Sequence, residues 1–264
     1  MQHANLAVYI LEGAMVFLIL YKILSARAGR RLFIRRIPGL SAIDEAVGRA
    51  TEMGRPLLFS PGIGGFNVVS LQALAILGHI ISLVAKYRSR VIVPTIDPLV
   101  YTIAEEAARD AYEANGAPEA FNRDDILYLT GDQFAYASGV VGVLHREKVA
   151  GAFYFGDFFA EALILSENGQ QVGAIQVAGT PQVTQVPFFI ASCDYTIIGD
   201  EFYAASAYLS REPTLLGSLV GQDYSKAILL VLMVLGIAAA TWLTITGFPS
   251  IEAALLRITT AFNG

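Results

Sequence analysis

Five acidic side chains and one threonine directly follow the predicted strands of this chain, and they are its strongest candidates for binding chemistry. Carboxylates gathered in one place can hold a divalent cation such as Mg²⁺, or accept hydrogen bonds from an amine or a ribose hydroxyl. The same residue types also act as N-caps of the helices that follow, and this structural role is the alternative at each position. The candidate residues are Asp97, Asp132, Asp157, Thr180, Asp200 and Glu201.

A glycine-rich turn follows the first predicted strand and adds Gly62, Gly64 and Gly65 to the same candidate site. A strand, a turn with Gly-x-Gly and a long helix resemble the start of a dinucleotide-binding fingerprint. The third glycine of that fingerprint would stand at position 67, where this chain has Asn67, and Asp97 lies beyond the usual separation of about 20 residues for the ribose-binding acid. The turn is therefore only a weak match to a dinucleotide-binding site. A small anion bound at the N-terminus of the following helix is the simpler prediction.

Common catalytic constellations are absent from the sequence. There is no Gly-x-Ser-x-Gly elbow, no Gly-Lys-Ser/Thr phosphate loop and no pair of histidines at zinc-binding spacing. The single cysteine, Cys193, lies in an apolar context and is expected to be a small core residue. These absences argue against a hydrolase and leave both the cofactor and any catalytic residue unknown.

Six short apolar runs alternate with stretches of helical length, which predicts a domain of the α/β class. Strands that alternate with helices form right-handed βαβ units, and continuous apolar strands indicate a sheet covered on both faces. We expect a Rossmann-like, mainly parallel sheet of about six strands with helices on both faces. The predicted strands are 57–60, 91–95, 126–130, 151–155, 173–178 and 195–198, and the predicted helices are 41–53, 66–89, 99–115, 132–147, 157–169 and 182–192.

Apolar stretches at the two ends, 6–24 and 227–246, are each long enough to cross about 30 Å of hydrocarbon. A third apolar stretch, 66–85, is interrupted by polar residues and followed by three cations, so we expect a buried helix of the α/β domain there. The predicted organisation is an external N-terminus 1–5, a transmembrane helix 6–24, a basic juxtamembrane linker 25–40, an α/β domain 41–225, a transmembrane helix 226–248 and an external tail 249–264 that can form an interfacial helix.

The distribution of basic residues predicts the orientation. No Lys or Arg precedes the first apolar stretch, whereas six lie between Lys22 and Arg36. Because positive charge is retained on the cytoplasmic side, we expect both termini outside a plasma membrane and the α/β domain in the cytoplasm. Residues 37–225 contain 21 acidic and 10 basic residues, a net charge of −11, which disfavours nucleic acid as a partner.

Two polar residues interrupt the predicted spans. Glu12 lies about 10 Å inside the outer end of the first span, and counting back the same distance in the second span reaches Thr241. An intramembrane carboxyl group usually faces protein, so the sequence predicts a contact between Glu12 and Thr241 if the two spans pair.

Five segments resemble an uncharacterised prokaryotic, membrane-associated family that is defined as a domain of unknown function. They are 35–39 (RRIPG), 42–56 (AIDEAVGRATEMGRP), 132–136 (DQFAY), 204–212 (AASAYLSRE) and 215–218 (LLGS). The resemblance covers about residues 30–225. It implies membrane association and a prokaryotic origin, and it implies no activity and no site residues.

Two functions fit these observations. Segments 132–144 and 202–208 are apolar around much of their circumference, which favours either the domain core or a neighbouring copy of the chain. The first function is therefore a membrane-anchored scaffold or assembly subunit that forms homo-oligomers through apolar helices and transmembrane segments. The alternative is a membrane-tethered enzyme or sensor that binds a nucleotide-like or metal-bound ligand at the carboxyl ends of the strands.

Overall fold

The computed structural model describes residues 6–29, 38–87, 89–210 and 212–245. The chain divides into two compact units, one formed by its two ends (Met1–Phe33 with Glu212–Gly264) and one formed by Ile34–Arg211. The expected external N-terminus 1–5, residues 30–37 of the basic linker and the tail 249–264 lie outside the described residues.

A parallel sheet of six strands forms the centre of the α/β unit and confirms the expected fold class. The strand order is β3-β2-β1-β4-β5-β6, the order of a doubly wound nucleotide-binding fold, and every neighbouring pair is parallel. The strands are β1 (Leu57–Gly62), β2 (Val91–Thr95), β3 (Ile126–Tyr128), β4 (Gly151–Asp157), β5 (Ile175–Thr180) and β6 (Tyr195–Ile198).

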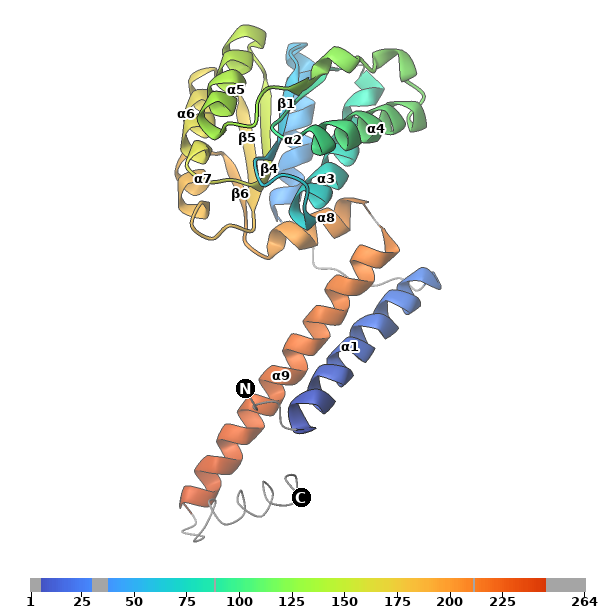
Figure 1. Cartoon of the computed structure of the whole chain (residues 1–264), viewed down its shortest axis with the longest axis vertical. Coiled ribbons are helices and arrows are strands. Elements are labelled where there is room, and N and C mark those ends of the chain that lie inside the picture. The colour runs from blue at the N-terminus through green and yellow to red at the C-terminus, as the bar shows by residue number, and fades with distance from the viewer. Residues whose placement is uncertain (1–5, 30–37, 88, 211, 246–264) are drawn as a thin grey trace. The chain divides into compact units, whose positions relative to one another are not determined.

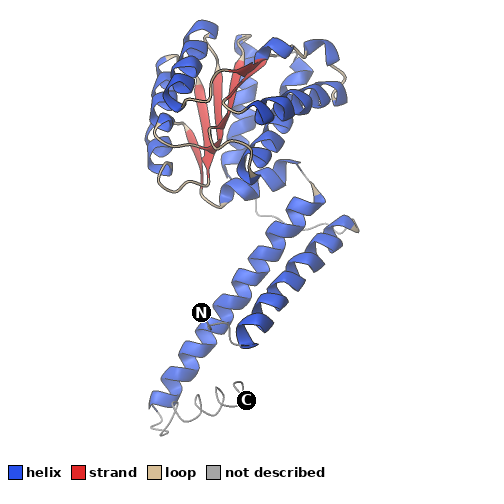
Figure 2. Ribbon diagram, viewed as in Figure 1, coloured by secondary structure: helices blue, strands red, loops and turns tan. Residues whose placement is uncertain are grey.

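Helices cover both faces of the sheet, as Figures 1 and 2 show. One face is covered by α2, α3, α4 and α8, and the other by α5, α6 and α7. The helices are α2 (Pro38–Met53), α3 (Val68–Val84), α4 (Pro98–Ala114), α5 (Gln133–Glu147), α6 (Glu161–Gln171), α7 (Val186–Ser192) and α8 (Glu201–Ser210), with short 3₁₀ turns at Ala85–Tyr87, Pro118–Ala120 and Arg123–Asp125.

The central strand β4 divides its side chains between two apolar cores. Phe155 stacks on Phe59 of β1 at 6.1 Å in the first core, which also includes α3. Tyr154 stacks on Phe189 of α7 at 6.0 Å in the second core. Because all of these rings are buried, the alternation along β4 fixes which face of the sheet each flanking helix covers.

Helix α3 contains the third apolar stretch of the sequence. It is long and apolar enough to cross a membrane by composition, but half of its apolar window is buried inside the structure. Its buried side chains belong to the first core of the α/β unit, so the expectation of a buried domain helix is confirmed.

The two ends of the chain form a pair of long helices, α1 (Leu6–Arg27) and α9 (Pro213–Ile245). Both are long and apolar enough to cross a membrane, and they are the candidate spans of this chain. Helix α9 begins at Pro213, whereas we expected the second span to begin at residue 226. No glycine-proline pair or other strong helix breaker separates residues 213 and 226, so the helix continues through the expected boundary.

Small residues set the close approach of α1 and α9. A Cβ atom added to Gly217 would lie 2.5 Å from the Cα of Ile23, and one added to Gly221 would lie 2.8 Å from the Cα of Ile19. Glycines spaced by four residues allow two helix backbones to approach closely, as in membrane helix pairs. The two contacts also define an antiparallel register, because Gly217 lies level with Ile23 and Gly221 with Ile19. Each residue of α1 therefore lies level with the α9 residue whose number adds to its own to give 240.

Candidate functional site

The carboxyl ends of β1 and β4 lie side by side at the point where the strand order reverses. Helix α3, which follows β1, covers one face of the sheet, and α6, which follows β4, covers the other. In open parallel sheets ligands bind at such a switch point. The glycine turn and Asp157 come from these two strands, so the structure brings the first two parts of the candidate site together.

The glycine turn closes directly over Asp157. Gly62 has a φ of +81°, and a Cβ atom there would lie 2.3 Å from the carbonyl oxygen of Asp157. A Cβ atom on Gly64 would lie 2.5 Å from Asp157 Oδ2. The turn therefore needs glycine because β4 and its terminal carboxylate occupy the space that a side chain would fill.

Two amide side chains hold the Asp157 carboxylate. Asn67 Nδ2 donates a hydrogen bond to Oδ2 at 2.8 Å, and Gln182 Nε2 donates one to Oδ1 at 3.0 Å. Asp157 is only 6% exposed, and it forms no ion pair with any cation in the described part of the chain. A buried carboxylate with neutral partners retains capacity to accept a further hydrogen bond or to face a cation.

The same asparagine caps α3. Its side chain accepts a hydrogen bond from the backbone N–H of Ser70, and the Ser70 hydroxyl accepts one from the backbone N–H of Asn67. This capping box uses two of the N–H groups at the helix N-terminus that an anion would bind. The expected anion site is thus partly satisfied within the chain.

Asp97 and Asp132 have the structural role of helix N-caps, which was the expected alternative to ligand binding. Asp97 Oδ1 accepts hydrogen bonds from the backbone N–H groups of Leu99 and Val100, and Asp132 Oδ1 accepts one from Ala135. Both are N-caps, of α4 and α5. Asp97 still borders the glycine turn, because a Cβ atom on Gly65 would lie 3.8 Å from its Oδ2.

The remaining candidates lie around the same edge. Thr180 ends β5, is fully buried, and its Oγ1 accepts a hydrogen bond from the backbone N–H of Gln182 at 3.2 Å. Asp200 and Glu201 lie at the start of α8. Burial, together with the negative charges of Asp157 and Asp200, raises the pKa of Tyr203 above its usual value of 10.0. Tyr203 therefore lies within the electrostatic reach of two candidate carboxylates.

A second buried carboxylate was missed in the sequence. Glu161, the first residue of α6, is 0% exposed and accepts hydrogen bonds from Gln133 Nε2 at 2.6 Å and from the backbone N–H of Phe159 at 3.0 Å. It lies near Tyr136, whose hydroxyl bonds the Ser60 hydroxyl at 2.8 Å and whose pKa is raised by burial. Acidic residues in the first turn of a helix are usually exposed to solvent, where they interact favourably with the helix dipole. Glu161 has this position in α6, so nothing in the sequence indicates that its side chain is buried.

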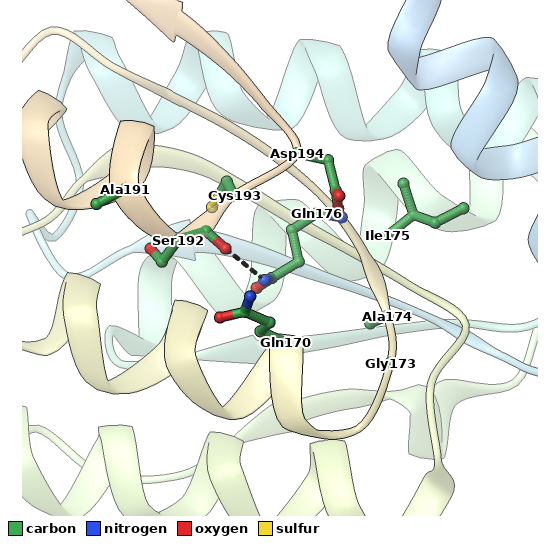
Figure 3. Close-up of a pocket in the computed structure, with 9 residues that line it drawn as sticks. All are labelled: Gln170, Gly173, Ala174, Ile175, Gln176, Ala191, Ser192, Cys193 and Asp194. Carbon is green, nitrogen blue, oxygen red and sulfur yellow. Dashed lines mark hydrogen bonds between the residues drawn. The ribbon is translucent and has the colours of Figure 1, made fainter.

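Metal binding has no support among the described residues, where no group of three or more His, Cys, Asp or Glu side chains could hold an ion. At the opposite, amino-terminal edge of the sheet a cavity of about 330 Å³ opens between α6, α7 and β5 (Figure 3). Gln176 in its lining donates a hydrogen bond from Nε2 to the carbonyl oxygen of Ser192 at 2.9 Å and from its backbone N–H to Asp194 at 2.7 Å. Its buried Oε1 accepts no hydrogen bond from the described residues. Burial raises the pKa of the Cys193 thiol to about 12, so this lining residue is protonated at neutral pH.

The structure does not bring Glu12 and Thr241 together. In the antiparallel register Glu12 lies level with Ile228, and Thr241 lies about 13 residues further along α9, roughly 20 Å away along the axis. The expectation of equal depth assumed that the first apolar stretch begins and the second ends at the same plane. The glycine contacts instead shift the two stretches relative to each other.

Exposed apolar side chains follow β1, β2, β3, β4 and β5 at the carboxyl edge, and Ile198 is the last residue of β6. Each is at least partly accessible, and Val183 is 75% exposed. Because the strands are parallel, the turns after them all meet at this edge. We call these residues the carboxyl-edge apolar set: Phe66, Val68, Leu99, Phe134, Phe159, Val183 and Ile198.

A model of one protein family matches residues 1–250, and that family is described as a domain of unknown function, DUF6754. The chain belongs to this family. The match covers both candidate spans and the α/β unit, so the DUF6754 region includes the helix pair as well as the carboxyl-edge site. Neither curated proteins nor solved structures gave a match.

Proposed function

We propose that this chain is a membrane-anchored scaffold or assembly subunit whose α/β unit docks on other protein through the carboxyl edge of its sheet. Helices α1 and α9 are the anchor in this proposal, and the α/β unit lies in the cytoplasm because Lys22, Arg27 and the arginines that follow flank α1 on that side. Both termini are then external to a plasma membrane.

The carboxyl-edge apolar set carries the proposal. Large apolar side chains exposed singly are normal on a protein surface, whereas gathered ones indicate an interaction site. Here every strand contributes at least one, at the edge that also carries the buried carboxylates Asp157 and Glu161. At a protein-binding surface buried apolar contacts supply most of the free energy, and hydrogen-bonding groups lie among them.

The experiment compares full-length variants in detergent by light scattering coupled to size exclusion. We expect the wild-type chain, 28.4 kDa as a monomer, to have a mass of more than one chain. Phe66→Ser combined with Val183→Ser should weaken that association by at least about tenfold, because each removes a large apolar contact.

The matched control is Tyr87→Ser combined with Ile190→Ser. Both residues are exposed apolar side chains, at 63% and 55%, but they precede β2 and β6 and so lie away from the carboxyl edge. The control should keep the wild-type mass. A monomeric wild type, or an equal loss in both double variants, would contradict the proposal.

A second candidate function is binding of a small hydroxyl- or amine-bearing ligand at Asp157. The observation that favours it is a buried carboxylate at the switch point with only amide partners. A phosphate 4 Å from this carboxylate would be repelled by roughly 4 kcal/mol per charge at an effective dielectric constant near 20. The charge therefore favours an uncharged nucleoside or an amine over a nucleotide.

Thermal shift of the full chain tests this candidate with adenosine, AMP and putrescine as probes. Adenosine or putrescine should raise the melting temperature, and Asp157→Asn should abolish the rise because the amide cannot accept the same hydrogen bonds. A shift with AMP alone, or shifts that survive in Asp157→Asn, would exclude the assignment.

A further inference from the structure

The cavity at the amino-terminal edge of the sheet contains a buried hydrogen-bond acceptor without a partner. Gln176 is 1% exposed, and its Nε2 donates a hydrogen bond to the carbonyl oxygen of Ser192 at 2.9 Å. Its Oε1 accepts none from the described residues. Because an unsatisfied buried acceptor costs free energy, proteins usually supply it with water, an ion or a ligand. The cavity of about 330 Å³ that Gln176 lines is therefore a place where a ligand can complete the structure (Figure 3).

The side chain of Gln170 controls access to this acceptor. Figure 3 shows the carboxamides of Gln170 and Gln176 pointing toward each other, and Gln170 is an exposed residue near the end of α6. Exposed side chains change rotamer within nanoseconds, so rotation of Gln170 opens a path from the cavity to Oε1. On its other side Oε1 lies against Gly169, where an added Cβ atom would be 2.1 Å away.

The electrostatic surroundings of the cavity favour a cation. Asp194 is an exposed residue of its lining, and its Oδ2 accepts a hydrogen bond from the backbone N–H of Gln176 at 2.7 Å. This carboxylate forms no ion pair with any described residue. Helices α6 and α7 both end at the cavity, and the C-terminal end of a helix carries a partial negative charge. In the described part of the chain, none of the nine lining residues is a lysine or an arginine.

These groups suit an organic cation that carries several N–H donors. A guanidinium group has five such donors in one plane, and it is more weakly hydrated than an ammonium group. It can bond the Asp194 carboxylate with two donors and retain others for Gln176 Oε1. The volume of about 330 Å³ is near the lower limit for ligand pockets, so the compound must be small.

We propose that the cavity between α6, α7 and β5 binds a small guanidinium compound, with Asp194 as its counter-ion and Gln176 Oε1 as its buried acceptor. The cavity lies at the sheet edge opposite to Asp157 and the carboxyl-edge apolar set, so this inference depends on neither function proposed above. Cys193 is the single cysteine of the chain and lines the same cavity, so its reactivity reports whether the cavity is occupied.

The test measures how fast methyl methanethiosulfonate, a small neutral reagent, modifies Cys193 in the full chain in detergent, with mass spectrometry as the readout. The reaction is run at about pH 8.5, where a guanidinium group remains charged. Methylguanidinium at saturation should slow the modification at least about fivefold, because the bound compound covers the thiol. N-methylurea has a similar shape and no charge, and at the same concentration it should leave the rate close to that without ligand.

Asp194→Asn removes the charge and keeps an oxygen that can accept the hydrogen bond from Gln176. It should raise the methylguanidinium concentration needed for half-maximal protection roughly 10-fold or more, as expected for loss of a hydrogen bond to a charged group. The control is Asp110→Asn, the same change of an exposed carboxylate on α4, which covers the other face of the sheet, and it should keep the wild-type protection.

An unchanged rate with methylguanidinium, or equal protection by N-methylurea, would overturn the inference. Both results come from the wild-type chain, so they hold even if Asp194→Asn does not fold. Wild-type protection in Asp194→Asn, or an equal loss in Asp110→Asn, would also contradict it.

Discussion

Replacing Gly156 by alanine is expected to destabilise the α/β unit by at least about 3 kcal/mol, or to prevent its folding. Gly156 lies in β4 with a φ of +147°, and an added Cβ atom would lie 2.0 Å from the carbonyl oxygen of Pro61. That oxygen belongs to the backbone of β1, so it cannot rotate away as a side chain would. Denaturant unfolding of the full chain, followed by far-ultraviolet circular dichroism, measures the change.

Gly142→Ala is the matched control for this prediction. Gly142 lies on an exposed position of α5, and an added Cβ atom would meet nothing within 4 Å. Alanine there should raise the free energy of unfolding by about 0.5–1 kcal/mol, because it favours the helix. If Gly156→Ala unfolds at the same denaturant concentration as wild type, the close approach of β1 and β4 is wrong.

The second large effect is expected from Gly221→Leu, which should force α1 and α9 apart and weaken their pairing by about 1–3 kcal/mol. The Cα of Ile19 occupies the space that the new side chain needs. Larger side chains at a helix contact give interaxial distances of 8–10 Å, so the separation must increase. The nearest atom is the backbone Cα of Ile19, which cannot rotate away as a side chain could.

Spin labels at Val8→Cys and Leu232→Cys, in a Cys193→Ser background, report the separation because the two positions lie level in the register. The label distance should lengthen or broaden in Gly221→Leu. Gly236→Leu is the control, since no atom lies within 4 Å of its added Cβ atom, and it should keep the wild-type distance. Identical distance distributions in both variants would show that Gly221 does not set the contact.

The strands and the α/β fold class could be predicted, because most strands are short apolar runs that helices cover on both faces of the sheet. The order of the strands in the sheet could not be predicted, since β1 and β4 are neighbours in the sheet but lie far apart in the sequence. The N-cap roles of Asp97 and Asp132 could be predicted, because each residue directly precedes a stretch of helical length. The special position of Asp157 could not be predicted, because its burial depends on two separate connections: the β1–α3 turn with Gly64 and Asn67, and the β5–α7 connection with Gln182.

The helix pair shows a similar limit. Hydropathy located both apolar stretches, but it carries no information on their register. Gly217 and Gly221 decide that register, and they lie before the apolar stretch 227–246 that the sequence predicted as the second span. The predicted contact of Glu12 with Thr241 failed for this reason, while the polar character of Glu12 within an apolar helix was evident from the sequence.

The central pairing of β1 with β4 also sets the timing of folding during synthesis. Leu57 of β1 pairs with Gly151 of β4, a separation of 94 residues in the chain. At about 5–20 residues per second, a ribosome needs roughly 5–20 s to add β4 after β1. Pairing of distant strands is slow even in a complete chain. During this interval α1 has already left the ribosome, and the open edge of β1 is available to any other unpaired strand.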